Sequence, residues 1–227
     1  MDEAAQARKF NGILAGPDGK LSSRRVNDQT RELTPRLISE GYKAQQEHLH
    51  ETTEYGTAAE GFGPLISQIV ERLGVSHLLD YGCGRRMSLL RTLKAKAKLT
   101  YQGYDPCSGV EELASAPVPA QLVCCIDVLE HIEPEYLDNV LDHLASLTEI
   151  VAFLSIHTGP ASKILQDGRN AHLTQKEMDW WLPKLWSRWD IQTVQKTHEH
   201  GFYVIAYSKP RLEAVNGSKI VVGETWP

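Results

Sequence analysis

The stretch Leu78-Leu79-Asp80-Tyr81-Gly82-Cys83-Gly84 decides the fold of this 227-residue chain. Residues 77–81 form a short apolar segment that predicts a β-strand; a turn with two glycines follows, and the pattern then becomes helical. Glycine lets the backbone turn sharply and approach a ligand closely, because it carries no Cβ atom. In an open parallel sheet, ligands lie outside the carboxyl ends of the strands. The stretch therefore predicts a strand–turn–helix unit with a ligand site at the turn.

The rest of the chain alternates between strand-like and helix-like segments. Helices are predicted to begin at Pro64 and Pro134, because proline is favoured in the first turn of a helix. Further strands are predicted, in chain order, at residues 100–104, 121–127, 150–156, 189–196 and 202–208. The last two are expected to form an antiparallel pair. This alternation predicts an α/β fold of three layers, with helices on both faces of a mainly parallel sheet.

Composition and charge narrow the class of protein. The net charge is −5, so a nucleic-acid partner is possible but not indicated. The longest apolar runs, such as residues 150–156, are too short to span a membrane, and the first residues lack the apolar core of a signal peptide. The four cysteines form no CxxC pair, which indicates free thiols in a reducing compartment. We therefore predict a cytoplasmic protein with no membrane partner and no metal site, and the oligomeric state stays open.

A second acidic position indicates the kind of ligand. Asp105 follows the predicted strand at 100–104, where a carboxylate can accept hydrogen bonds from both ribose hydroxyls of a nucleoside. The third glycine of a dinucleotide-binding pattern would fall at Met87, so that pattern is incomplete. Asp80, just before the glycines, disfavours a pyrophosphate but suits a cofactor that carries an ammonium and a sulfonium. These residues favour S-adenosylmethionine (SAM) over a dinucleotide.

Four segments, in this order, resemble the class I SAM-dependent methyltransferases, especially the type 11 and type 12 methyltransferase domains. They are residues 78–84, Tyr104-Asp105, residues 127–132 (Asp-Val-Leu-Glu-His-Ile) and residues 171–177 (Ala-His-Leu-Thr-Gln-Lys-Glu). The resemblance implies a Rossmann-like methyltransferase sheet of seven strands with an antiparallel last strand. It also implies SAM as the cofactor and S-adenosylhomocysteine (SAH) as the product.

Two features depart from that family's pattern. Arg86 stands where the family usually has another glycine. Only about fifteen residues separate Asp105 from the strand at 121–127, so the sheet is predicted to be shortened around the family's third strand. That strand is expected to be absent or reduced to residues 116–118. The domain plan that follows is an N-terminal arm and helical lid at 1–62, a methyltransferase domain at 63–210 and a C-terminal tail at 211–227.

The candidate cofactor-binding residues come from the matched segments and from the N-terminal arm. Tyr55 and Gly56 are included because a helical arm before the first strand often closes over the cofactor in related methyltransferases. Cys83 is interpreted as a small residue that fills space between the glycines. The full set of candidates is Tyr55, Gly56, Asp80, Gly82, Cys83, Gly84, Tyr104, Asp105, Asp127 and Val128.

The candidate acceptor site lies after the later strands. His157, His172 and His131, in that order, are candidates for a general base, and a structural role is the alternative for each. Arg169 and Asn170 belong to a polar cluster on a predicted rim loop, which suits acceptor binding. Trp181 is included as a candidate aromatic wall, although it also fits the apolar stripe of its own helix.

Three functions remain open at this point. The first is methyl transfer from SAM to a small-molecule acceptor such as a nucleotide, a sugar or another metabolite, which the acidic net charge favours. The second is methylation of a nucleic-acid base. The third is a non-catalytic SAM-binding partner or sensor protein, for which Arg86 and the shortened sheet are the support.

Overall fold

The computed structural model describes residues 35–53, 57–94 and 98–209. Its strands are β1 (His77–Tyr81), β2 (Thr100–Tyr104), β3 (Ala120–Ile126), β4 (Thr148–His157), β5 (Trp189–His198) and β6 (Gly201–Ser208). Its α-helices are α1 (Glu40–Thr52), α2 (Gly63–Leu73), α3 (Ser88–Thr92), α4 (Glu111–Ala114), α5 (Leu137–Leu147) and α6 (Met178–Trp186). The described residues also form the 3-10 helices η2 (Ala58–Phe62) and η3 (Leu129–His131).

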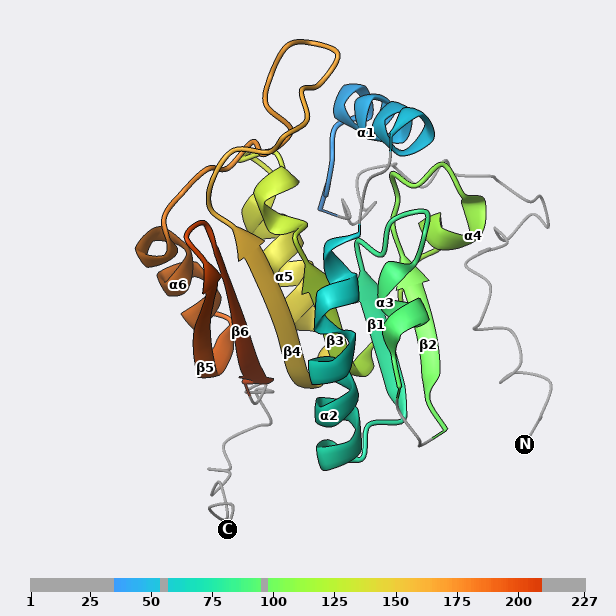
Figure 1. Ribbon diagram of the computed structural model, residues 1–227, viewed down its shortest axis with the longest axis vertical. Coiled ribbons are helices and arrows are strands. Elements are labelled where there is room, and N and C mark those ends of the chain that lie inside the picture. The colour runs from blue at the N-terminus through green and yellow to red at the C-terminus, as the bar shows by residue number, and fades with distance from the viewer. Residues whose placement is uncertain (1–34, 54–56, 95–97, 210–227) are drawn as a thin grey trace, which may run out of the picture. The chain divides into compact units, whose positions relative to one another are not determined.

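The six strands form one sheet in the order β2-β1-β3-β4-β6-β5 (Figure 1). β1 pairs in parallel with β2 on one side and with β3 on the other, and β3 pairs in parallel with β4. β6 is antiparallel to both β4 and β5. The predicted α/β fold, with a mainly parallel sheet and an antiparallel last strand, is confirmed.

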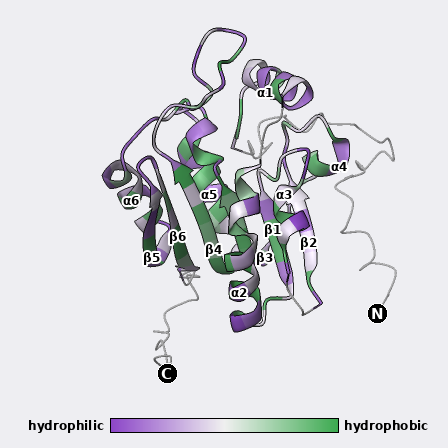
Figure 2. Ribbon diagram, viewed as in Figure 1, coloured by the Kyte–Doolittle hydropathy of each residue, from purple (hydrophilic) through white to green (hydrophobic). Residues whose placement is uncertain are grey.

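Helices cover both faces of the sheet because successive strand residues point to opposite sides. Leu79 and Val123 belong to a buried cluster that includes residues of α5 and α6, whereas Leu78 and Leu122 belong to a second cluster with residues of α2 and α3. Figure 2 shows that the central strands are largely hydrophobic, as expected for strands buried on both faces. This arrangement gives the three predicted layers.

Some predicted boundaries need correction. Helix α5 begins at Leu137 and not at Pro134, because residues 134–136 form a turn. Residues 116–118 form no strand, and the sheet ends at β2. Among the described residues the sheet therefore has six strands and not the seven implied by the resemblance, because the segment between β2 and β3 has room only for the one-turn helix α4. The prediction of a sheet shortened around the third strand is confirmed.

Helix α1 is fastened to the segment that follows β3. Ser39 caps the helix, and its side chain accepts a hydrogen bond from the Tyr42 backbone N–H. Ser39 in turn donates to the buried Glu133 carboxylate twice, from its backbone N at 2.8 Å and from Oγ at 2.6 Å. These bonds hold α1 near the carboxyl ends of the parallel strands (Figure 1). Most of the predicted arm, residues 1–34, lies outside the described residues.

None of the described helices is long and apolar enough to cross a membrane.

Candidate functional site

A cavity of about 530 Å³ lies at the carboxyl ends of the parallel strands. The segments that follow β1, β2, β3 and β4 all contribute to its lining, and α1 and η2 add to it. β1 lies between β2 and β3, so the chain reverses its direction across the sheet there, which is the usual ligand position in such folds. The polar side chains of the lining include Tyr42, Gln46, His50, Asp80, Asp105, Asp127, His131, His157, Lys163 and His172.

The glycine turn forms the floor of the cavity after β1. Gly82 adopts φ 78° and Gly84 adopts φ 62°, which are left-handed conformations that glycine tolerates best. A Cβ atom on Gly82 would lie 2.3 Å from Cγ2 of Val128, so the close approach of these two segments requires glycine. The Tyr104 carbonyl accepts hydrogen bonds from Gly82 N and Cys83 N and holds the turn in place.

A Gly82→Ala variant is expected to lose roughly 2–4 kcal/mol of unfolding free energy, from the left-handed φ and the clash together. Gly74→Ala is the matched control, because Gly74 also has positive φ, at 64°, but a Cβ atom there meets nothing within 4 Å. Its expected loss is about 1–2 kcal/mol, from φ alone. Urea denaturation measures both, and equal losses would show that Val128 gives way without cost.

Asp105 is the best-connected carboxylate of the site. It is 7% exposed, and its two oxygens accept hydrogen bonds from Gly84 N at 3.0 Å and from Cys107 N at 2.8 Å. Nε2 of His50, on α1, lies 3.8 Å from Oδ2. Burial raises the pKa of Asp105, while His50 and the backbone N–H groups oppose the rise. A carboxylate oxygen has two lone pairs, so each oxygen can still accept a hydrogen bond from a ligand.

Asp80 also lines the cavity, at the end of β1. It is 2% exposed and accepts a hydrogen bond from the Tyr101 hydroxyl at 2.5 Å. Burial raises the pKa of Asp80 to about 7, and nearby Asp105 adds to the rise. The described residues of the lining include three acidic side chains, Asp80, Asp105 and Asp127, and one lysine, Lys163. This excess of acidic groups suits a positively charged ligand.

Asp127 stands at the end of β3 in a rare conformation. Its φ is 51°, a left-handed value that aspartate tolerates better than most residues. Ser155 fixes this residue, since its carbonyl and its Oγ both accept from Asp127 N, and Oγ donates to Asp127 Oδ1 at 2.6 Å. Unusual backbone conformations of this kind cluster at functional sites.

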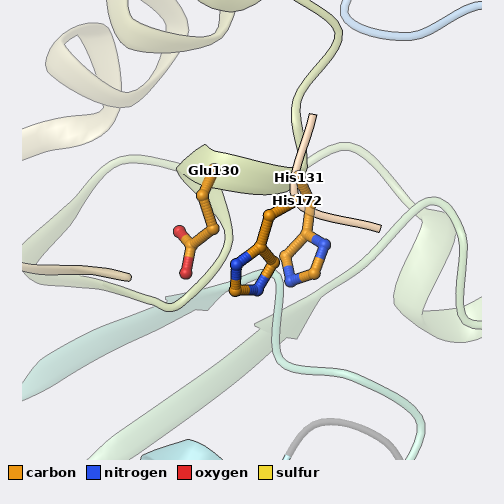
Figure 3. A group of neighbouring side chains, drawn as sticks. All are labelled: Glu130, His131 and His172. Carbon is orange, nitrogen blue, oxygen red and sulfur yellow. The ribbon is translucent and has the colours of Figure 1, made fainter. Parts of the chain in front are cut away.

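The three candidate bases lie together next to Asp127. The ring centroids of His131 and His172 are 4.6 Å apart, and those of His157 and His172 are 4.9 Å apart. Burial lowers the pKa of His172 and, with the help of His172, lowers the pKa of His131 to about 3. Glu130, next to His131 on η3, is fully buried, and burial raises its pKa far above the usual range. Figure 3 shows Glu130, His131 and His172 side by side.

A comparison with known protein families identifies the family of this chain. Residues 46–206 match the family described as "Methyltransferase domain", and this match covers most of the chain. The chain belongs to this family of methyltransferases. SAM is the cofactor.

Several solved structures of methyltransferases are similar to this chain. Magnesium protoporphyrin IX methyltransferase from Synechocystis PCC 6803, crystallised with SAH, is 18% identical, with 67% of this chain and 84% of that chain covered and a TM-score of 0.48. A SAM-dependent methyltransferase from Aquifex aeolicus is 14% identical over 72% of this chain and 98% of that one, also with a TM-score of 0.48. An O-methyltransferase family protein from Burkholderia thailandensis is 13% identical over 76% and 63%, again with a TM-score of 0.48. No curated protein matches the chain.

The residues around the glycine turn fit SAM chemically. The Asp105 oxygens keep lone pairs for the ribose hydroxyls, and the missing Cβ atoms of the turn let the backbone approach a ligand. Asp80 adds a second carboxyl group to the lining, and a carboxylate suits a cofactor that carries an ammonium and a sulfonium. Of the predicted cofactor residues, those that line the cavity are Asp80, Gly82, Cys83, Gly84, Asp105, Asp127 and Val128.

Other predicted cofactor residues behave differently. Tyr104 does not line the cavity, and its contribution is the carbonyl that holds the glycine turn, while its ring packs in the core. Tyr55 and Gly56 lie outside the described residues. Burial raises the pKa of the Cys83 thiol, which agrees with its interpretation as a space-filling residue.

The three predicted acceptor-binding residues do not line the cavity, which corrects their placement. Trp181 is fully buried in the core, and its Nε1 donates to the Lys176 carbonyl, so its ring has no face left for an acceptor. Arg169 is exposed and pairs with Asp167 at 2.7 Å. Asn170 holds its own loop together, because its side-chain oxygen accepts from the backbone N of Ala161 and of His172.

Helix α1 supplies lining residues that the sequence pattern did not single out. Tyr42 donates its hydroxyl hydrogen to the His131 carbonyl at 2.6 Å, and Gln46 donates to the Tyr42 hydroxyl. One turn further along the helix, His50 reaches Asp105. The spacing of 42, 46 and 50 marks one helical face, but its polar residues resemble a solvent-exposed face in the sequence.

Proposed function

We propose that this SAM-dependent methyltransferase transfers a methyl group to a small-molecule acceptor. The observation that carries the proposal is the buried Asp105 carboxylate beside the glycine turn, in a cavity that continues past β3 and β4 to a group of histidines. This arrangement provides for a nucleoside at the β1 and β2 end of the cavity. It leaves the β3 and β4 end for the acceptor.

Each residue of the cofactor end has a proposed task. Asp105 accepts hydrogen bonds from the ribose hydroxyls, Asp80 neutralises the ammonium group, and the backbone of Gly82 and Gly84 lies against the cofactor. When bound, SAM supplies an electrophilic methyl group on a positively charged sulfur. The protein's own contribution is to fix the acceptor in line with that methyl group, because positioning alone can supply a large part of the rate enhancement of a two-reactant step.

The lining of the acceptor end favours a small molecule. The cavity lining combines apolar side chains such as Leu37, Ile38 and Ile132 with the histidines His131, His157 and His172. Among the described residues, Lys163 is the lysine of the lining and no arginine belongs to it. A nucleic-acid substrate is bound chiefly through lysine and arginine contacts to phosphates. The exposed Arg85 and Arg86 lie beside His50 in a separate, smaller depression.

His157 is the proposed general base for an acceptor that must lose a proton. It follows β4, lines the cavity and is held by Gly159, whose N and O both lie 3.2 Å from Nδ1. His131 suits the task less well, because its pKa of about 3 makes it a weak proton acceptor at neutral pH. His172 is the second candidate.

Calorimetry with SAM and SAH, followed by a transfer assay with radiolabelled methyl, tests the proposal. We expect both ligands to bind at one site, and label to move to a small molecule from a panel of hydroxyl, amine and carboxylate acceptors. Label that moves only to RNA or DNA would support methylation of a nucleic-acid base instead. Tight SAM binding without transfer to any acceptor would support a SAM-binding sensor or partner protein.

A His157→Gln variant is expected to lower kcat by about 100-fold, while the affinity for SAM stays unchanged. His200→Gln is the matched control, because His200 lies in the turn between β5 and β6 and does not line the cavity. The measurement is turnover at saturating acceptor over a pH series. An unchanged kcat in His157→Gln would exclude His157 as the base.

A further inference from the structure

Glu130 is a buried carboxylate with an unused oxygen. The residue is fully buried on η3, and Oε1 accepts a hydrogen bond from His157 N at 3.0 Å. Oε2 is the one buried side-chain oxygen or nitrogen among the described residues that has no hydrogen-bond partner. An unpaired buried polar group is costly, so each exception in a native fold requires an explanation, and a bound ion is one of them. Two histidines, His131 and His172, lie close to this carboxyl group.

His131 and His172 both direct one ring nitrogen to a backbone carbonyl. Nδ1 of His131 lies 2.8 Å from the Ala171 oxygen, and Nδ1 of His172 lies 2.7 Å from the Gly159 oxygen. A carbonyl oxygen only accepts, so in both residues Nδ1 carries the hydrogen and Nε2 carries the lone pair. Histidines that bind metal ions almost always donate their other ring N–H to a carbonyl or a carboxylate in this way.

The three side chains converge. One ligand atom from each of Glu130, His131 and His172 lies within 4.8 Å of the others (Figure 3). Metal ions hold nitrogen and oxygen ligands at about 2.0–2.2 Å, so two ligands of one tetrahedral ion lie about 3.4 Å from each other. The three side-chain atoms therefore need to approach one another by about 1 Å to share one ion. We propose that Glu130, His131 and His172 form a binding site for a divalent transition-metal ion.

The donor set indicates the class of ion. Two imidazole nitrogens and one carboxylate oxygen suit Zn²⁺, Co²⁺, Fe²⁺ or Mn²⁺, whereas Mg²⁺ and Ca²⁺ prefer oxygen ligands throughout. A dication also supplies the positive charge that a fully buried carboxyl group such as Glu130 needs in order to ionise. Three protein ligands leave coordination positions open, as in catalytic rather than structural metal sites.

The site lies in the wall of the cavity. His131 and His172 both line it, next to His157 and Asp127. An ion held there presents its remaining coordination positions to whatever occupies the acceptor end. We infer that it takes an oxygen donor of the acceptor, such as a hydroxyl or a carboxylate. This last step rests on the proposed function, whereas the ion site itself does not.

Metal binding by the full chain tests the proposal. After dialysis against a chelator, the protein is titrated with Co²⁺, and the visible absorption of bound Co²⁺ and the heat of binding are recorded. We expect one bound ion per chain, competition by Zn²⁺, and no competition by Mg²⁺ at the same concentration. Glu130→Gln, His131→Gln and His172→Gln are each expected to weaken Co²⁺ binding by at least about tenfold.

Controls separate this site from surface histidines and from misfolding. His77→Gln removes an exposed histidine at the start of β1 and should leave the Co²⁺ titration unchanged. Glu130→Gln preserves an oxygen for His157 N, so circular dichroism should show a native fold. Wild-type Tm should rise with Zn²⁺, and the Tm of the three variants should not.

Two outcomes would overturn the metal site. One is a native chain that binds no Co²⁺ or Zn²⁺ above the level of a triple ligand variant, which would make Glu130 a permanently protonated core residue. The other is tight binding that none of the three substitutions weakens. SAM calorimetry on the same samples keeps the two proposals apart, because SAM binding without metal binding contradicts only the metal site, and the reverse result contradicts only the proposed function.

Discussion

An Asp105→Ala variant is expected to bind SAM at least about 100-fold more weakly than the native chain. Each hydrogen bond from a ribose hydroxyl to a charged acceptor contributes about 1.5–3 kcal/mol, and two such bonds account for a loss of this size. The buried position of Asp105 makes the loss larger than at a surface, because little water is present to replace the carboxylate. Calorimetry with SAM and SAH measures it.

The same substitution is expected to lower the unfolding free energy by roughly 2–4 kcal/mol, since the N–H groups of Gly84 and Cys107 lose their acceptor. Binding is therefore measured on samples whose folded fraction is known from circular dichroism. Asp105→Asn serves as a milder variant that keeps one accepting oxygen. Asp190→Ala, an exposed position on β5, is the matched control. Native SAM affinity in a folded Asp105→Ala variant would contradict the assigned ribose site.

The fold and the residues that line the cavity beside the glycine turn were predictable because both depend on short stretches of sequence. β1 and β2 have the bounds that the sequence indicates. In β1 every residue after His77 is buried, and a strand buried on both faces has few polar residues that could obscure its ends. Asp80, Gly82 and Asp105 then follow directly from strand ends. In a parallel sheet all carboxyl ends meet at one edge, so residues far apart in sequence are brought together without any knowledge of side-chain packing.

The lining of the cavity after β3 and β4 was predicted less well, because side-chain direction there depends on tertiary contacts. Arg169 and Asn170 stand on the expected loop, but the loop directs Arg169 to Asp167 and uses Asn170 for its own hydrogen bonds. Trp181 lies on the inner face of α6, where the helical stripe already indicated a core position. A polar cluster on a loop indicates its approximate location, not which side chains reach the cavity.

Contacts between side chains that are far apart in the sequence could not be predicted from it. His131 and His172 are about forty residues apart and show no metal-ligand spacing, so the sequence predicted no metal site. Glu130 becomes a candidate ligand only when the structure shows that Oε2 is buried and has no hydrogen-bond partner. The contact of His50 with Asp105 depends on how α1 is fastened through Ser39 and Glu133, and no local pattern encodes that fastening.

An Asp80→Asn variant is expected to be more stable than the native chain at pH 8 when no SAM is present. Burial raises the pKa of Asp80 from its ordinary value of 3.8 to about 7. Between these two values the folded chain keeps a proton that the unfolded chain has released, so the unfolding free energy of the native chain falls as the pH rises through this window. At 1.36 kcal/mol per unit the fall is about 4 kcal/mol at most. Asparagine cannot ionise, so the variant avoids it.

SAM binding should show the opposite preference. A positively charged cofactor favours the ionised Asp80, so native SAM affinity should rise with pH up to about 7, and Asp80→Asn should bind SAM at least about tenfold more weakly at pH 8. Asp105 is retained in the variant, so the difference between the two chains isolates Asp80. Tyr101→Phe removes the hydrogen bond that lowers the Asp80 pKa and should move the pH dependence upward. Urea denaturation and calorimetry from pH 5 to pH 8 measure both effects. Equal pH dependence in the native chain and in Asp80→Asn would mean that Asp80 is ionised throughout, and that the cavity stabilises its charge without the cofactor.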